Sequence, residues 1–253
     1  MDNQIPIRIS IVSYLNSKPF INGLKKVKFN LPVEISEDIP SICAEKLLGG
    51  KADIGLIPVS ILSRLKNYSI ISDYCIGADG AVNSVLLLSE VPLKEIKTIL
   101  LDYQSRTSVL LARVLAKKFW NINPKWEETS SDYEKNIIAD KAGVVIGDRA
   151  LLMKNKFPYV YDLSAEWKLF TGLPFVFACW VSLLDLEKDF LSDFNDALKY
   201  GLSTIKEIAK KECSSEISEE EISNYLTKSI DYNLNESKKK ALQLFLEMAK
   251  DVN

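Results

Sequence analysis

Histidine is absent from this 253-residue sequence, which removes the side chain that enzymes use most often as a general base and metal ligand. The cysteines are few and scattered, with no Cys-x-x-Cys pair: Cys43, Cys75, Cys179 and Cys213. These features exclude a Cys/His zinc site and a Cys/His nucleophile, so we expect buried, reduced thiols. A glycine-rich phosphate loop is also missing. We expect no cofactor and no metal, and any chemistry must use carboxylates, hydroxyls, amides, cations or the substrate itself.

An excess of charge of either sign is missing as well. The chain has 32 Lys and Arg against 34 Asp and Glu, a formal net charge of −2. This balance argues against a nucleic acid or an anionic membrane surface as the main partner. Any anion-binding site must therefore be local.

Long apolar runs and targeting features are lacking too. The longest apolar stretches, such as residues 175–181, fall far short of the roughly 20 residues that cross a bilayer. Residues 1–8 show no basic region, no apolar region and no small-residue cleavage site. We expect a cytoplasmic protein that does not span a membrane, and the oligomeric state is left open.

What the sequence does contain is an internal repeat. Ser13-Tyr14-Leu15-Asn16 and residues 102–108 each place polar side chains directly after an apolar strand, at an offset of about 90 residues. Residues 52–57 are echoed by residues 142–147 at nearly the same offset. A chain of this length can form two lobes of about 100 to 150 residues each. The sequence therefore predicts two similar α/β lobes with a binding cleft between them, walled by the two polar turns.

The hydrophobic pattern predicts strands that alternate with helices. We expect strands at 7–12, 33–36, 53–57, 70–73, 84–89, 98–101, 143–146, 159–163 and 175–184. We expect helices near Pro19, at 42–48 with Ser41 as cap, after Pro58, after Ser105 and Thr107, after Gly147, and at 187–211, 218–228 and 237–250. The strand at 84–89 is a candidate crossing between the lobes, and the strand at 175–184 is a candidate return.

The segment Ser105-Arg106-Thr107-Ser108 opens a predicted helix. Backbone N–H groups at a helix N-terminus, joined by hydroxyls, bind a carboxylate or a phosphate without net protein charge. An ordinary N-cap with a surface arginine is the alternative, because Ser and Thr are preferred at caps. The preceding Asp102 and the repeat partner at Asn16 favour a binding function.

Five more residues are candidates for the site. Asn16 either hydrogen-bonds a ligand or stabilises its own turn, and Tyr14 lies in the same turn. Ser84 is of interest only if its strand bridges the lobes and faces the cleft. Gly147-Asp148 forms another strand-to-helix turn, where the aspartate is either a ligand contact or a helix cap.

Taken together and in order, these segments resemble the chorismate dehydratases of the futalosine route to menaquinone, over most of the chain. The segments that carry the resemblance are Ser13-Tyr14-Leu15-Asn16-Ser17-Lys18-Pro19, residues 52–60, Gly80-Ala81-Val82-Asn83-Ser84-Val85, residues 101–108, Ile146-Gly147-Asp148-Arg149-Ala150 and residues 171–180. Beyond about Leu184 the resemblance has no distinctive motif.

The resemblance implies a fold and a set of site residues. The fold is a two-lobed α/β fold like that of type II periplasmic binding proteins, with lobe I from residues 1–82 and 178–253 and lobe II from residues 83–177. The family's functional pair corresponds to Asn16 and Ser84. Its carboxylate-binding turn corresponds to Ser105, Arg106, Thr107 and Ser108. We expect Tyr14, Gly147 and Asp148 to bind the substrate as well.

The reaction that the resemblance implies is loss of water from chorismate, which gives 3-[(1-carboxyvinyl)oxy]benzoate by an E1cB-type elimination. The base is either the substrate's own enolpyruvyl carboxylate or a protein group, Asp148 or Asp102. Two other functions stay open: a non-catalytic solute-binding protein for a small carboxylate, and the sister enzyme that forms 1,4-dihydroxy-6-naphthoate. The absence of an export signal argues against the first, and the absence of a histidine base argues against the second.

Overall fold

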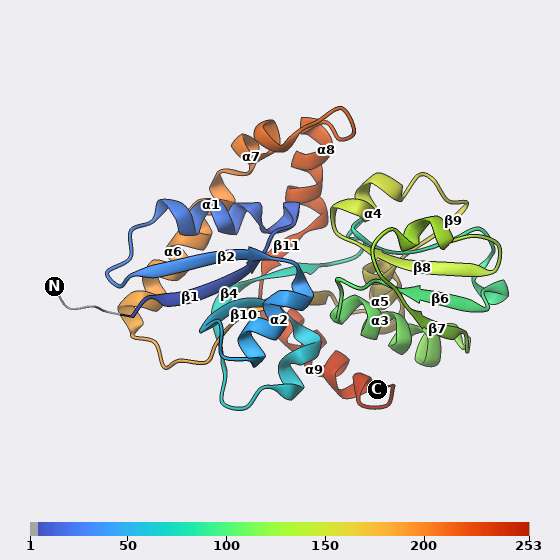
Figure 1. The fold of residues 1–253 in the computed structure, drawn as a ribbon, viewed down its shortest axis with the longest axis horizontal. Coiled ribbons are helices and arrows are strands. Elements are labelled where there is room, and N and C mark those ends of the chain that lie inside the picture. The colour runs from blue at the N-terminus through green and yellow to red at the C-terminus, as the bar shows by residue number, and fades with distance from the viewer. Residues whose placement is uncertain (1–4, 253) are drawn as a thin grey trace.

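Two β-sheets side by side, each covered by helices, form the two lobes of the molecule (Figure 1). The computed structural model describes residues 5–252. The residues at the very start of the chain, on which the expected lack of a leader partly rests, lie outside this range. Within it, no helix is long and apolar enough to cross a membrane.

Lobe I is built on a six-stranded sheet with the order β11-β4-β10-β3-β1-β2. β1 is parallel to β2 and β3, whereas β10 runs antiparallel to both of its neighbours and β11 runs antiparallel to β4. The strands are β1 (Ile7–Val12), β2 (Val33–Asp38), β3 (Ile54–Pro58), β4 (Ser69–Ala78), β10 (Phe175–Ser182) and β11 (Asp231–Asn233).

Lobe II is built on a five-stranded sheet with the order β7-β6-β8-β5-β9. β6 is parallel to β7 and β8, and β5 runs antiparallel to β8 and β9. The strands are β5 (Val85–Ser89), β6 (Thr98–Leu101), β7 (Lys125–Glu128), β8 (Lys141–Ile146) and β9 (Tyr159–Asp162).

The two sheets repeat one another, as the sequence offset predicts. β2-β1-β3-β10-β4 in lobe I and β7-β6-β8-β5-β9 in lobe II have the same order and the same strand directions. In each sheet, the antiparallel strand is the one that follows a passage of the chain from the other lobe. The predicted division at residues 82/83 and 177/178 stays a prediction, and β10 joins the sheet of lobe I already at Phe175.

Helices lie on both faces of the sheet of lobe I, with α1 and α6 on one face and α2 and α9 on the other (Figure 1). This cover explains why β3 and β10 are buried along their whole length. The α-helices are α1 (Lys18–Lys26), α2 (Pro40–Leu48), α3 (Thr107–Leu115), α4 (Asp148–Met153), α5 (Leu163–Thr171), α6 (Lys188–Ser203), α7 (Ile205–Glu212), α8 (Glu219–Asn224) and α9 (Glu236–Ala249).

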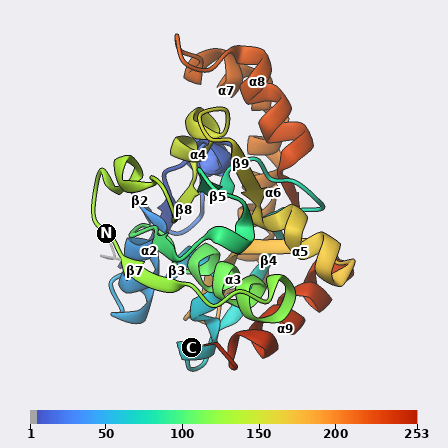
Figure 2. The ribbon, with the colours of Figure 1, turned by 90° about the vertical axis from the view of Figure 1, so that its right-hand side faces the viewer.

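Short helical segments of other types complete the fold. The 3₁₀ segments are η1 (Leu15–Ser17), η2 (Val59–Arg64), η3 (Leu93–Glu95) and η5 (Tyr133–Asn136), and the π-helical segments are η4 (Ala116–Trp120) and η6 (Tyr225–Ser229). The helices α7 and α8 lie at one end of the molecule and α9 at the other, in both views (Figure 2). The C-terminal part of the chain therefore flanks both lobes from two sides.

The predicted cap at Ser41 is wrong. α2 begins at Pro40 with Ile39 as its N-cap, and Ser41 lies inside the helix. Proline has a helical φ and no N–H to leave unsatisfied, so it takes the first helical position. The backbone N–H of Ser41 instead donates to the carbonyl of Gln104 in lobe II at 3.2 Å.

The helix predicted at 187–211 is two helices, α6 and α7, which meet at Thr204. The Thr204 hydroxyl donates to the Gly201 carbonyl at 2.7 Å and accepts from Asn22 Nδ2 at 2.8 Å. A side chain that satisfies the last carbonyls of a helix allows the chain to turn there.

The strand predicted as the crossing between lobes pairs with β8 and β9 of lobe II and begins at Val85. Ser84 lies just before this strand, and residues 79–84 make the crossing itself. Asn83 has φ of 62° there, a left-handed conformation that asparagine tolerates. Its backbone N–H donates to Asp162 Oδ2 at 2.6 Å, which anchors the crossing to lobe II.

Two glycines allow α1 and α6 to touch backbone to backbone. A Cβ at Gly23 would lie 1.9 Å from the Ala197 carbonyl oxygen, and a Cβ at Gly201 would lie 1.9 Å from the Pro19 carbonyl oxygen. Any larger residue must push the helices apart. This contact sets the distance of α1, and of the η1 turn before it, from α6.

We predict that Gly23→Ala lowers the free energy of unfolding by about 2 kcal/mol or more, because the clash is with backbone atoms that cannot rotate away. Urea unfolding followed by circular dichroism measures the change. Lys199→Ala, on the exposed face of α6, is the control and should unfold close to the wild type. Equal midpoints for the two variants would contradict the close packing.

Candidate functional site

A pocket lies between the lobes, where the carboxyl ends of parallel strands from both sheets face each other. Ligands of α/β proteins bind at such ends. The pocket encloses about 540 Å³ including its open mouth. It is lined by Val12, Tyr14, Asn16, Ser17, Pro40, Pro58, Ile76, Val82, Ser84, Val85, Ser105, Arg106, Thr107, Ser108, Ile146, Gly147, Phe177 and Ala178.

Most residues that the sequence singled out meet in this pocket. Lobe I contributes Tyr14 and Asn16, and lobe II contributes the turn 105–108 and Gly147, with Ser84 at the crossing. Asp148 and Asp102 are not among the lining residues. In the described part of the chain, Arg106 is the one Lys, Arg, Asp or Glu residue in the lining.

The turn 105–108 is built as a helix N-terminus that points at the pocket. α3 begins at Thr107, and its N-cap residue Arg106 makes no side-chain cap. The Ser105 hydroxyl accepts from the Ser108 N–H at 3.1 Å, and all three hydroxyl residues are buried. The first N–H groups of a helix have no partner within the helix, so they can donate to an anion.

Two contacts of this turn reach across to lobe I. Thr107 Oγ1 accepts from the Ser60 N–H at 3.2 Å, and Arg106 lies 3.6 Å from the Glu45 carboxylate at the surface. Both partners of the second contact are exposed, so this ion pair adds little stability. Because Glu45 binds the Arg106 guanidinium only weakly, the guanidinium is available to an incoming anion.

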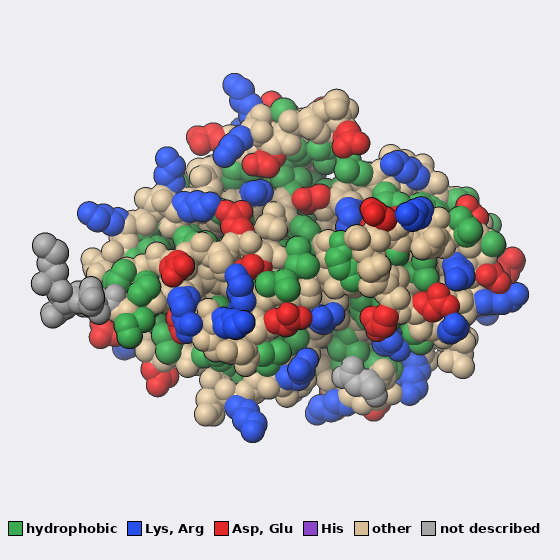
Figure 3. Space-filling view, viewed as in Figure 1, with side chains coloured by type: hydrophobic (Ala, Val, Ile, Leu, Met, Phe, Trp, Pro, Cys, Tyr) green, Lys and Arg blue, Asp and Glu red, His purple; other side chains and the backbone are tan. Residues whose placement is uncertain are grey.

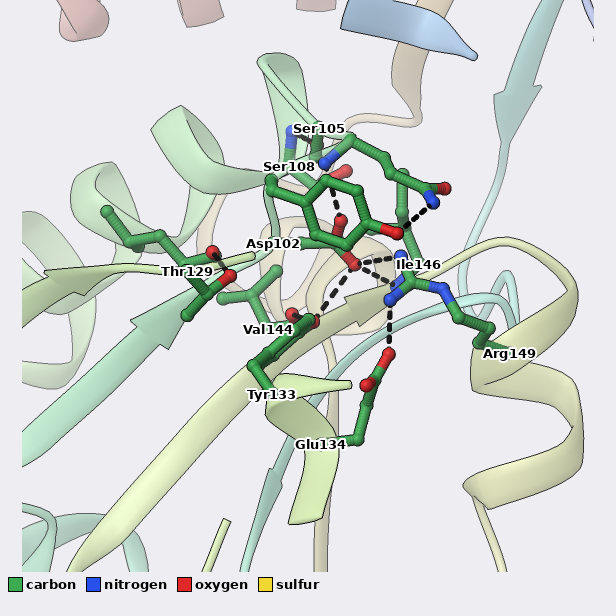
Figure 4. Close-up of polar contacts among 12 residues, drawn as sticks. Asp102, Ser105, Ser108, Thr129, Tyr133, Glu134, Val144, Ile146 and Arg149 are labelled. Carbon is green, nitrogen blue, oxygen red and sulfur yellow. Dashed lines mark hydrogen bonds and ion pairs between the residues drawn. The ribbon is translucent and has the colours of Figure 1, made fainter. Parts of the chain in front are cut away.

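Asp102 anchors the turn from beneath (Figure 4). One carboxylate oxygen accepts from the Gln104 N–H at 2.9 Å. The other accepts from Tyr133 Oη at 3.0 Å, the Ile146 N–H at 3.2 Å and Arg149 Nη2 at 2.7 Å. Burial raises the pKa of Asp102, and Arg149 acts in the opposite direction. Both oxygens of the Asp102 carboxylate therefore accept hydrogen bonds from the protein.

Arg149 projects from α4 between Asp102 and Glu134 and pairs with both (Figure 4). Its guanidinium also lies over the rings of Tyr103 and Tyr133, at 5.4 and 5.8 Å from the ring centroids. This network ties the end of β6 to the end of β8. The position of the turn 105–108 follows from it.

Tyr14 forms the opposite wall. Gly147 has φ of 65°, a conformation that favours glycine, and a Cβ there would also crowd the Tyr14 ring, at 3.0 Å from two of its carbons. The Tyr14 hydroxyl donates to Gln104 Oε1 in lobe II. Burial raises the pKa of Tyr14, so the phenol stays protonated and remains a donor.

Asp148 makes a contact between the lobes outside the pocket. Its Oδ1 accepts from the Leu15 N–H at 3.1 Å, and its side chain lies in a separate cavity that Lys18 and Glu212 also line. Burial raises the pKa of Asp148, and the hydrogen bond from Leu15 acts in the opposite direction. Asp148 is the first residue of α4, and its carboxylate contacts the η1 turn at Leu15.

Asn16 and Ser84 are linked by a residue that the sequence did not single out. Asn16 Nδ2 donates to the Tyr225 hydroxyl at 3.3 Å, and Tyr225 donates to Ser84 Oγ at 2.8 Å. All three are buried. Tyr225 lies in η6, far beyond the last recognisable motif, and a buried tyrosine in a helical segment carries no local pattern that distinguishes it from a core aromatic.

Comparison with known proteins shows the family of the chain. A family model described as menaquinone biosynthesis matches residues 7–251. A chorismate dehydratase of Campylobacter jejuni is 29% identical over 255 residues, covering 99% of this chain and 95% of the relative. A chorismate dehydratase of Thermus thermophilus is 27% identical over 230 residues, covering 82% of each protein.

Solved structures show the same fold at low sequence identity. A protein from Archaeoglobus fulgidus has a TM-score of 0.76 at 16% identity and covers 99% of this chain and 98% of that one. A Candida albicans protein described as having the generic periplasmic binding protein fold has a TM-score of 0.64 at 14% identity, covering 98% and 90%. The fold is thus the periplasmic-binding-protein-like fold, and the chain belongs to the menaquinone biosynthesis family.

Proposed function

We propose that this protein is a chorismate dehydratase, a hydro-lyase that converts chorismate to 3-[(1-carboxyvinyl)oxy]benzoate and water in menaquinone biosynthesis. The observation that carries the proposal is the pocket between the lobes, lined by hydroxyls, an amide and a helix N-terminus, in a chain related over most of its length to two chorismate dehydratases. The partner is a small molecule, and a cytoplasmic location remains part of the proposal.

The chemistry needs hydrogen-bond donors rather than a strong protein base. The C3–H bond of chorismate is next to the ring alkene that carries the ring carboxylate, so the anion formed by loss of this proton is conjugated with the carboxylate. Removal of this proton moves an electron pair into the ring and onto this carboxylate, which forms an enolate. The electron pair then returns to form the last ring double bond and expels the C4 hydroxyl with its bonding electrons. Together with the abstracted proton, this hydroxide forms water.

Each wall of the pocket has a role in this reaction. The N-terminus of α3 and the hydroxyls of Ser105, Thr107 and Ser108 hold the ring carboxylate, where negative charge grows in the transition state. Asn16 and Ser84 orient the enolpyruvyl arm and the leaving hydroxyl. Arg106 attracts the dianion at the mouth.

The base in this proposal is the substrate's own enolpyruvyl carboxylate. Within residues 5–252, no Asp or Glu lines the pocket. The two protein alternatives, Asp148 and Asp102, accept hydrogen bonds that hold the turns in place. A carboxylate that the substrate brings to its own C3 needs no group from the protein.

We predict that purified protein converts chorismate to a product lighter by one water, with benzoate absorbance and without release of pyruvate. The reaction should proceed in the presence of a chelator and without added nucleotide. Mass spectrometry of the product measures the outcome. Unchanged chorismate together with tight binding would support the solute-binding alternative, and pyruvate with hydroxybenzoate would indicate a lyase of another kind.

We predict that Asn16→Ala and Ser84→Ala lower kcat by about a hundredfold, because each removes a donor that acts in the transition state. Arg106→Ala should mainly raise KM, since it attracts the dianion before reaction. Steady-state kinetics separates the two effects. Arg113→Ala is the control, because Arg113 also lies on α3 but stacks on Trp126 of β7, away from the pocket. Its kcat and KM should stay close to those of the wild type. Near-normal kcat in both Asn16→Ala and Ser84→Ala would overturn the site assignment.

We predict that Asp148→Asn keeps kcat within about tenfold of the wild type, because its amide oxygen can still accept from the Leu15 N–H. Loss of all turnover in this variant, with product binding unchanged in calorimetry, would make Asp148 the base. Asp148→Ala gives the comparison, since it also removes the contact between the lobes.

A further inference from the structure

The Tyr225 hydroxyl lies between the side chains of Asn16 and Ser84, at 3.3 Å from Asn16 Nδ2 and 2.8 Å from Ser84 Oγ. Tyr225 itself is not among the residues that line the pocket. It therefore contacts both members of the proposed catalytic pair from behind. It can affect a ligand only through them.

The direction of these hydrogen bonds follows from Ser17. The Ser17 hydroxyl donates to Asn16 Oδ1 at 3.0 Å, which turns the amide nitrogen toward Tyr225. The oxygen of Tyr225 accepts from this nitrogen, so its single proton goes to Ser84 Oγ. Ser84 already accepts this proton and keeps its own for another partner. The amide nitrogen of Asn16 likewise keeps its second proton.

We propose that Tyr225 is a positioning residue that sets Asn16 and Ser84 as hydrogen-bond donors toward the pocket. The inference rests on the proposed function and deepens it, because it states what the pair recognises. Two donors side by side fit an oxygen acceptor that gains negative charge, and in this reaction the departing C4 hydroxyl is such a group. A pair free to act as acceptors would give no such help.

The surroundings hold Tyr225 in this role. Tyr225 is 4% exposed, and burial raises the pKa of its phenol, so the hydroxyl stays protonated. Other contacts of the same C-terminal segment lie nearby: Tyr232 donates to the backbone carbonyl of Asn16 at 2.9 Å, and the side chain of Asn83, next to Ser84, donates to Ser229 Oγ at 3.0 Å. Neither contact touches the side chain of Asn16 or Ser84, so the direction of their hydrogen bonds is set by Tyr225 and Ser17.

The test compares Tyr225→Phe with Tyr232→Phe. Each variant removes one buried tyrosine hydroxyl beside Asn16, but only Tyr225 touches the two side chains. We expect Tyr225→Phe to lower kcat by about 10- to 100-fold with KM changed by less than about threefold, because misplaced donors act on the transition state. Tyr232→Phe should keep kcat within about threefold, with a similar loss of thermal stability. Equal kcat values for Tyr225→Phe and the wild type would overturn the inference.

A double variant separates positioning from general damage. On a Ser84→Ala background, Tyr225→Phe should cost less than on the wild type, because one of the two donors that it directs is already gone. Fully multiplicative losses on this background and also on an Asn16→Ala background would show that Tyr225 acts through neither side chain and would overturn the inference.

An NMR measurement distinguishes failure of this inference from failure of the proposed function. The side-chain amide signals of Asn16, assigned by their loss in Asn16→Asp, should shift in Tyr225→Phe. If wild-type protein leaves chorismate unchanged, the proposed function is wrong and the catalytic role of Tyr225 falls with it. If wild-type protein is active but the amide signals do not move in Tyr225→Phe, the hydrogen-bond arrangement is wrong while the function stands.

Discussion

Asp102 holds the architecture of the site, because its fully buried carboxylate collects donors from four elements of lobe II. They are the turn after β6, η5, the end of β8 and α4. A buried charge that loses its partner costs about 3 to 5 kcal/mol, so these segments can separate only at a high cost. The N-terminus of α3, which follows the turn, takes its position from this one group.

In the proposed function, the pocket binds an anion mainly by polarity, with the single charge of Arg106 at its mouth. Over the face in Figure 3, basic and acidic side chains are interspersed, in agreement with the net charge of −2. Apart from Arg106, the donors that line the pocket are hydroxyls, an amide and backbone N–H groups. Neutral donors in a water-poor site favour the state in which negative charge is growing, whereas a buried lysine or arginine would also hold the ground state tightly.

The sequence predicted what is local and missed what is not. The two polar turns and the turn at Gly147 follow apolar strands, so their place at the cleft could be inferred from strand direction and the repeat. Tyr225 could not be found this way, because its partners Asn16 and Ser84 lie more than a hundred residues away along the chain. The break at Thr204 has the same origin, since Asn22, which supports it, lies 182 residues earlier in the chain.

The order of strands in lobe I has a consequence for how the chain folds. β10 lies between β3 and β4, yet it is made only after all of lobe II. Until it arrives, two apolar strand edges that later pair with it stay open, and open edges invite pairing with other chains. Such distant pairing is also slow to form. The strands of lobe II, β5 to β9, follow one another along the chain without a strand of lobe I between them. The sheet of lobe II can therefore form completely before β10 has joined the sheet of lobe I.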